Sequence, residues 1–245
     1  GEKLWEFRTV PGPGEPFNET WGDGWEDRSG TNMWAFSAPV DLDLNLVFLP
    51  IAGPAPNYYG GGRPGTNEFG NSIVAVDLDT GEYRWHFQTV HHDIWDIDAS
   101  SGGAFVEVTR NGQTTDALAY VGKSSYVFVL DRATGTPFHE VEERPVPAGD
   151  VPSEYYHPTQ PFPVVPPPLS RVSFTPDDIV TADQTSAAHA AACRAFMERS
   201  GGFANAGPFT PVNYKAPDDP PKSTIQFPGG TGGVNWGGIT VDPRT

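Results

Sequence analysis

A five-residue element, Asp-x-x-Thr-Gly, occurs twice in this chain and constrains the fold more than any other feature. It stands at residues 77–81 and 131–135, and each copy follows an apolar run, at residues 72–76 and 126–130. The pattern predicts a repeated β-hairpin with a fixed turn. Self-similar β units separated by long insertions are typical of a propeller, in which each blade buries a face against the next.

Composition supports an all-β fold. The chain has 245 residues with 28 Gly and 26 Pro, spread between short runs rich in Val, Phe, Tyr and Trp, which favours strands and long loops. We expect three to four blades of four-stranded antiparallel sheet, fewer than a closed ring has. Residues 1–245 are interpreted as one partial propeller, with an insertion over residues 139–232 that holds a Pro-rich crossover and a short helix. Both ends fall inside a repeat unit, so the chain looks like an internal fragment.

Charge and cysteine content exclude several functions. The net charge of −16 disfavours nucleic acid and anionic membranes, because phosphate binding needs clustered Lys and Arg. Neither an apolar run near 18 residues nor a signal-peptide pattern is visible. The single Cys193 cannot form an internal disulfide, and the sequence lacks a Cys-x-x-Cys-His haem motif. Redox chemistry would therefore need a bound cofactor.

One short segment carries most of the candidate chemistry. Residues 91–98 hold two His, three Asp and one Trp. A plain polar loop remains an equal alternative from composition alone. We interpret His91 and His92 as hydrogen-bonded loop supports, because no third ligand has the spacing of a zinc site.

Two other patterns have structural interpretations. Trp5, Trp85 and, less clearly, Trp21 are expected to dock one blade on the next. A helix is predicted within residues 185–202, which are rich in Ala and end in two glycines. His189 and Cys193 share a face of that helix, and we interpret the face as packed or surface rather than metal-binding.

Five longer sequence motifs give the chain a family resemblance. It resembles the PQQ-dependent (quinoprotein) dehydrogenases, particularly the membrane-associated glucose, quinate and polyol branch. These motifs are residues 30–34, 77–98, 142–147, 159–163 and 233–237. The resemblance implies an eight-bladed propeller with PQQ in its channel and a divalent cation on the quinone. The implied reaction is oxidation of an alcohol, polyol or sugar hydroxyl, with hydride transfer to PQQ.

The resemblance also assigns roles to individual residues. Asp96 matches the catalytic base, which removes the hydroxyl proton, and Asp96 with Asp98 would serve the metal. On a strand these two carboxylates would point to the same side. Lys123 matches a cation that contacts the quinone oxygens, and Trp34 matches the indole that stacks on PQQ. The plain alternative is that Lys123 and Asp96 merely form an ion pair.

Further positions are carried over with less detail. Asn235 and Trp236 match a second cofactor-contacting pair, and Thr31 and Asn32 match the cofactor rim. The usual metal-binding Asn falls at Gly53, and whether Asn57, four residues further on, replaces it is left open. Other cofactor residues of the family would precede Gly1.

The resemblance implies partners and a location as well. They are a small alcohol or sugar as substrate, a quinone or cytochrome as electron acceptor, and a periplasmic or extracytoplasmic site, with any membrane association through segments outside this chain. The metal is open between calcium and a lanthanide. The alternative function is a non-catalytic propeller scaffold that uses the Trp-docking repeats for assembly. A glycoside hydrolase is disfavoured, because Asp96 and Asp98 are too near in sequence to flank a sugar.

Overall fold

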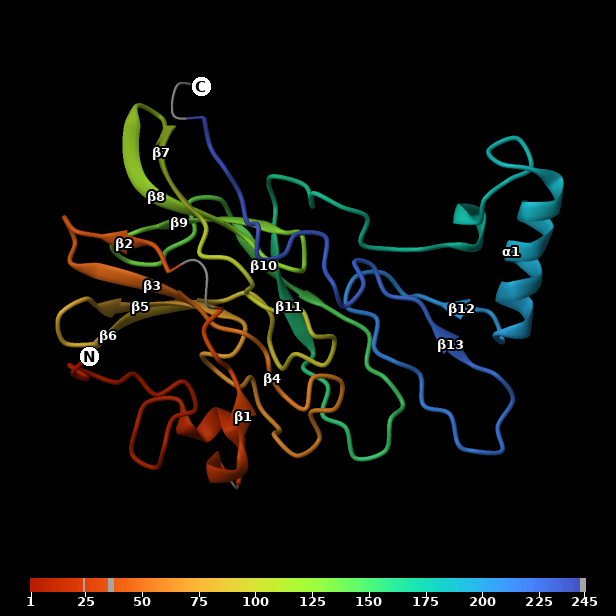
Figure 1. Ribbon diagram of the computed structural model, residues 1–245, viewed down its shortest axis with the longest axis horizontal. Helices are drawn as coiled ribbons and strands as arrows, with labels where there is room; N and C mark the ends of the chain where they lie inside the picture. Colours follow the sequence, from red (N-terminus) through yellow and green to blue (C-terminus); the bar gives the residue numbers. More distant parts are fainter. Residues whose placement is uncertain (24, 35–37, 243–245) are drawn as a thin grey trace.

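The fold is mostly β, and two antiparallel sheets form its centre. The computed structural model describes residues 1–23, 25–34 and 38–242. Figure 1 shows the two sheets next to each other at one end of the molecule, with the only α-helix of the described residues, α1, at the far end. The sheets are β2(Val40–Asp41)-β3(Leu46–Pro50)-β5(Ser72–Asp77)-β6(Tyr83–Gln88) and β7(Ala104–Arg110)-β8(Gln113–Val121)-β9(Val127–Asp131).

Smaller elements surround these sheets. The two-stranded pairs are β1(Ser29–Gly30) with β4(Pro54–Ala55), β10(Val141–Pro145) with β11(Thr159–Pro163), and the parallel pair β12(Phe203–Ala204) with β13(Ser223–Thr224). The helical elements are η1(Asn18–Trp21), η2(Trp25–Asp27), η3(Pro176–Asp178) and α1(Ala187–Arg199).

The described residues hold fewer complete blades than expected. One sheet has four strands and one has three. Next to β9 the chain makes only an isolated bridge, Leu130 to Pro137, where a fourth strand would run, because Pro cannot donate to a ladder. The all-β propeller class is confirmed by the comparisons below, whereas the expected number of four-stranded sheets is wrong.

The repeated element forms the same turn in both sheets. Oδ1 of Asp77, and likewise Oδ1 of Asp131, accepts from the two backbone amides and the Thr hydroxyl that follow it, at 2.9–3.1 Å. Gly81 and Gly135 then adopt a φ of 72°, which suits glycine. The predicted hairpin turn is therefore confirmed in both copies.

Each repeat turn is covered by a tryptophan from the preceding unit. A Cβ on Gly81 would lie 2.5 Å from the Trp5 ring, and a Cβ on Gly135 would lie 2.5 Å from the Trp85 ring. Each indole N–H also donates to a carbonyl of the turn that it covers, at 3.0 and 3.1 Å. Trp21 differs: it is fully buried, but it donates to the loop before β5 and covers neither of the two repeat turns.

The main core lies between the two sheets. It combines residues of β3, β5 and β6 with residues of β8 and β9, and it extends under the loop that joins β6 to β7. Burial of these apolar groups is the main force that holds the two sheets together. Its buried aromatic members are Phe48, Trp85, Trp95, Tyr120, Tyr126, Phe128, Phe162 and Phe209, and Ile73, Ile94, Leu118 and Leu130 pack among them.

The insertion is more ordered than a polyproline crossover. Residues 141–145 and 159–163 pair as the antiparallel strands β10 and β11, although both contain proline. Phe162 belongs to the main core, and Gln160 is fully buried. The prolines hid this hairpin in the sequence, because proline usually argues against a strand. It is tolerated here at strand positions that need no N–H donor. The predicted helix is confirmed as α1, which Ser186 caps by accepting from the His189 amide at 3.2 Å.

The first repeat turn makes stability depend on pH. A hydrogen bond from Arg84 at 2.9 Å is the main cause that lowers the pKa of Asp77 to about 2, whereas an unfolded Asp titrates near about 3.9. The folded pKa is the lower one, so the stabilisation exists above about pH 4 and is lost as the pH falls towards about 2.

Asp77→Asn should therefore unfold at a lower urea concentration than the wild type at neutral pH. The difference between the two urea midpoints should disappear under acid. Urea melts between about pH 7 and about pH 2 measure this. Arg84→Leu removes the same ion pair, so the difference between its urea midpoint and that of the wild type should also decrease under acid. A difference in urea midpoint that stays constant with pH would contradict a stabilising ion pair between Asp77 and Arg84.

The described residues contain no helix that is both long and apolar enough to cross a membrane.

Candidate functional site

Three loops from the two sheets meet at Lys123. The Lys123 Nζ atom lies 2.9 Å from Oδ2 of Asp96 and 2.6 Å from Oδ2 of Asp98. It also lies 5.7 Å from the ring centre of Trp34, within cation–π range. The structure therefore brings together the four residues with the most detailed sequence assignments, and the ion pair considered as the plain alternative is present.

Lys123 is charged in this environment. Its side chain is 6% exposed, and burial opposes the charge of an ammonium group. The hydrogen bonds that Lys123 donates to Asp98 and Asp96 outweigh that burial, so the pKa of Lys123 stands above its ordinary value. The site thus presents a fixed positive charge beside an indole ring.

Asp96 is held in an unusual backbone conformation. The residue lies in an irregular loop between β6 and β7, with a φ of 63°, so the expectation that it stands on a strand is wrong. Its carboxylate nevertheless faces Lys123, as that of Asp98 does. Asn57 Nδ2 donates to Oδ1 of Asp96 at 2.6 Å. Asn57 therefore reaches the site.

Asp98 is the more enclosed of the two carboxylates. Its side chain is 8% exposed, compared with 21% for Asp96. Oδ1 accepts from the Gly53 amide at 2.8 Å while Oδ2 accepts from Lys123. Gly53 thus supplies a backbone donor where the family alignment expects a side-chain ligand.

A buried network supports this loop from below. The Asp93 carboxylate is buried and accepts from the amides of Trp95 and Ile97 and from Asn71. Burial raises the pKa of Asp93 to about 6. Arg63 Nη2 donates to the carbonyls of Asp93 and of Pro56, so it ties the loop of Asp96 to the loop of Asn57.

The other residues that the resemblance assigned to the cofactor have contacts of their own. Thr31 is fully buried, and its hydroxyl lies 3.2 Å from that of Thr9. Asn32 is exposed, and its carbonyl accepts from the Ala52 amide. Asn235 Nδ2 donates to the Thr231 carbonyl at 2.6 Å, and Trp236 is 65% exposed.

A glycine-rich segment, residues 229–233, connects this last pair to the site. The Gly233 amide donates to the Lys123 carbonyl at 3.1 Å. A Cβ on Gly230 would lie 3.9 Å from Oδ2 of Asp96, and a Cβ on Gly232 would lie 2.6 Å from that of Lys123. Only glycine allows so close an approach at Gly232. The segment therefore packs directly on the site, and Asn235 and Trp236 follow it.

The histidines have structural partners. His91 lies 2.5 Å from Oε1 of Gln88 and 3.1 Å from Oε1 of Glu143, and His92 lies 2.9 Å from the Gly65 carbonyl. Their interpretation as hydrogen-bonded loop supports is confirmed. In the described part of the chain, no group of three or more His, Cys, Asp or Glu residues is arranged to hold a metal ion. This includes the helix face of His189 and Cys193.

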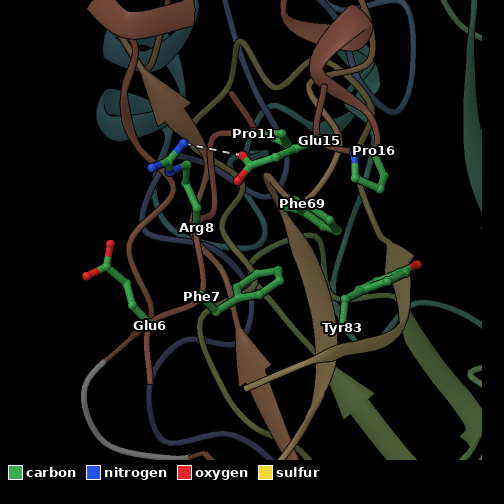
Figure 2. Close-up of a pocket in the computed structure, with 8 residues that line it drawn as sticks. All are labelled: Glu6, Phe7, Arg8, Pro11, Glu15, Pro16, Phe69 and Tyr83. Atoms are coloured by element: carbon green, nitrogen blue, oxygen red, sulfur yellow. Dashed lines mark hydrogen bonds and ion pairs between the residues drawn. The ribbon is translucent and has the colours of Figure 1, made fainter. Parts of the chain in front are cut away.

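A separate pocket of about 270 Å³ lies near the N-terminus. Figure 2 shows the rings of Phe7, Phe69 and Tyr83 on one side, with Arg8 and Glu15 joined by a weak ion pair of 3.5 Å. None of its lining residues belongs to the Lys123 site. The Lys123 site and this pocket, which is lined by both apolar and charged residues, are therefore different features of the molecule.

Comparison with known proteins decides the family. The model of the glucose/ethanol/alcohol dehydrogenase β-propeller domain, a PQQ family, matches residues 1–245. The chain belongs to the PQQ-dependent dehydrogenase family. Its cofactor class is therefore PQQ, as the sequence motifs indicated.

Individual relatives agree with this family. The chain is 35% identical to the quinoprotein glucose dehydrogenase of Escherichia coli K12 over its whole length, but spans 29% of that protein. It is 34% identical to the glycerol dehydrogenase large subunit of Gluconobacter oxydans 621H and spans 31% of it. A solved quinohemoprotein alcohol dehydrogenase, ADHIIG from Pseudomonas putida HK5, matches 66% of this chain and 25% of its own, with 28% identity and a TM-score of 0.51.

Sequence reasoning left out three parts of the site. It passed over Asp93 and treated Gly53 as a departure, and it left Asn57 undecided. One signal was available: Asn57 lies in the connection from β3 to β5, and Lys123 lies in the equivalent connection from β8 to β9. Superposing the two repeat units would have placed both residues at the same end of their sheets.

Proposed function

We propose that this chain supplies part of the active site of a PQQ-dependent dehydrogenase that oxidises an alcohol, polyol or sugar hydroxyl. The observation that carries the proposal is the position of Lys123 Nζ, within 3 Å of two carboxylates and 5.7 Å from the Trp34 ring. A flat indole and a fixed cation suit a planar, anionic cofactor. When bound, PQQ would accept one hydride, which carries the two electrons of the oxidation, from the substrate carbon.

The two carboxylates are suited to different tasks. Asp98 is enclosed and bonded to both Lys123 and the Gly53 amide, so we assign it to hold the Lys123 ammonium. Asp96 is more exposed, and Asn57 fixes its orientation. We therefore assign Asp96 Oδ2 to accept the hydroxyl proton of the substrate.

The same oxygens fit part of a metal shell. Calcium and lanthanide ions prefer hard oxygen donors, and calcium takes about 6–8 of them. The carboxylates of Asp96 and Asp98 and the amide oxygen of Asn57 are of that kind. We propose that these three would contribute to the ion that the family implies, and that its other ligands come from the cofactor or from further chain.

The cofactor contacts around this centre are proposals as well. Trp34 would stack on the PQQ plane, and Asn32, Asn235 and Trp236 would contact its edge. Thr31 is buried against Thr9, so we assign it to hold the turn that presents Asn32 and Trp34. The partial propeller over residues 1–245, with its insertion at residues 139–232, would need further blades to close the channel.

The electron acceptor and the location of the protein are also proposed from its family. We propose a quinone or a cytochrome as acceptor and an extracytoplasmic location. The relatives named above carry sugars and polyols in their names, which favours substrates of that class for this protein too.

Reconstitution tests the proposal directly. The purified chain is mixed with PQQ and either Ca²⁺ or La³⁺, and dye reduction is followed with glucose, glycerol and simple alcohols. Metal-dependent reduction with at least one of them is expected. A folded chain that binds PQQ but reduces no dye with any substrate would restrict the role of this chain to cofactor binding.

Replacing the central cation should weaken cofactor binding. Lys123→Met is expected to lower the affinity for PQQ by about tenfold or more, since a charge-assisted hydrogen bond contributes about 1.5–3 kcal/mol. Fluorescence titration measures this. Lys222→Met is the matched control, because Lys222 also pairs with an Asp, Asp150, at 2.5 Å but lines no part of the site. Equal losses in the two variants would contradict the assignment of Lys123.

A further inference from the structure

The buried carboxylate of Asp93 accepts hydrogen bonds from three N–H donors. The residue is 2% exposed. Its Oδ1 accepts from the Trp95 amide at 2.8 Å, and its Oδ2 accepts from the Ile97 amide and from Asn71 Nδ2, both at 2.9 Å. One buried carboxylate therefore binds the backbone on both sides of Asp96.

This arrangement determines where Asp96 points. Asp96 stands between the two clamped amides with a φ of 63°, a left-handed conformation that a residue with a Cβ adopts at a cost in energy. Such a conformation persists only where its surroundings impose it. With the amides of Trp95 and Ile97 turned inward to Asp93, the Asp96 side chain is directed outward to Lys123 and Asn57.

Only a carboxylate can make all three contacts. Three N–H donors converge on two oxygens, and in an Asn side chain one of those oxygens becomes an NH₂ group. Whichever way that amide turned, a donor would face either the Trp95 amide or the amides of Ile97 and Asn71. Asp93→Asn is therefore nearly isosteric but breaks the clamp.

Gly53 fits the same design. A Cβ at this position would lie 2.6 Å from Oδ2 of Asp93, so a side chain here would collide with the clamp. The Gly53 amide meanwhile donates to Oδ1 of Asp98. The absence of a side chain at Gly53 makes room for Asp93 and leaves a backbone donor for Asp98.

We infer that Asp93 is a positioning residue, which holds Asp96 and Asp98 on Lys123 by clamping the amides of Trp95 and Ile97. Its importance for catalysis rests on the proposed function. The geometry of the clamp does not, because it can be tested in the protein without cofactor.

The test compares Asp93→Asn with Asp131→Asn. Asp131 is the matched control, because it also accepts two backbone amides, at 2.9 Å, but in a repeat turn outside the site. Two readouts use the chain without PQQ: hydrogen exchange at the Trp95 and Ile97 amides, and exchange of the Lys123 ammonium protons by NMR. In Asp93→Asn, both are expected to become about tenfold faster, because strong hydrogen bonds are lost. In Asp131→Asn, both should stay as in the wild type.

The third readout is PQQ affinity with Ca²⁺, which should fall about tenfold in Asp93→Asn alone. Unchanged exchange at Lys123 in folded Asp93→Asn would overturn the inference. If the wild type binds no PQQ, the proposed function fails, while the exchange data still decide the role of Asp93. If Asp93→Asn does not fold, Asn71→Gly replaces it, since glycine suits the φ of 52° at this position. Faster exchange at Lys123 in that variant supports the clamp, and unchanged exchange overturns it.

Discussion

Asp96→Asn is expected to reduce turnover of the protein loaded with PQQ and metal by about 10²–10⁴-fold, the range that a positioned general base contributes. The substitution keeps the shape of the side chain and one oxygen for Asn57. It removes the group that would accept the substrate proton. Lys123 stays paired with Asp98 at 2.6 Å, so the variant should fold as the wild type does.

Steady-state dye reduction measures this effect, and the loss should appear in kcat more than in KM. Asp43→Asn is the matched control, because Asp43 is an exposed carboxylate in the turn between β2 and β3. It should retain wild-type turnover. Comparable activity in Asp96→Asn and Asp43→Asn would contradict the role of Asp96 as the base.

The second large effect concerns the contact between repeat units. Trp85→Ala is expected to destabilise the fold by about 3–5 kcal/mol, the usual cost of emptying a buried Trp site. Trp85 is 6% exposed, packs 5.6 Å from Phe48 and covers the turn at Gly135. Its loss therefore opens the main core and frees the second repeat turn at once. Urea unfolding measures the change.

A pair of glycine variants separates that contact from backbone strain. Gly135 and Gly112 have similar φ values, 72° and 78°, but a Cβ would meet the Trp85 ring at 2.5 Å in the first and nothing within 4 Å in the second. Gly112→Ala should cost only the left-handed strain, about 1–2 kcal/mol. Gly135→Ala adds overpacking of about 1–3 kcal/mol. Equal costs for the two would contradict a docking role for Trp85.

The repeat units were predictable because their signals are local. The apolar runs and the Asp-x-x-Thr-Gly turn lie within short stretches of sequence, and the tryptophan that covers each turn stands at a fixed place in the preceding unit. The turn needs Asp77 or Asp131 to accept from its own following residues, so sequence spacing determines the geometry. The docking of Trp85 on Gly135 follows from the repeat itself.

The support of the site was harder to predict, because it depends on residues far apart in sequence. Asn57 reaches Asp96 from the adjacent connection, and Asn71 reaches Asp93 from the start of β5. Two of these residues, Asn71 and Asp96, have positive φ, and no periodic pattern describes such backbones. The β10–β11 hairpin was missed for a different reason, since its prolines contradict the usual strand signal.

The proposed function depends on binding of PQQ by the loops around Lys123. This binding is measured by titrating the folded wild-type chain with PQQ in Ca²⁺, in La³⁺ and in a chelator, with tryptophan fluorescence as the signal. Saturable binding at one PQQ per chain is expected, which requires the metal and weakens in Lys123→Met. Absence of saturable binding under every metal condition, in a chain that circular dichroism shows to be folded, would contradict it.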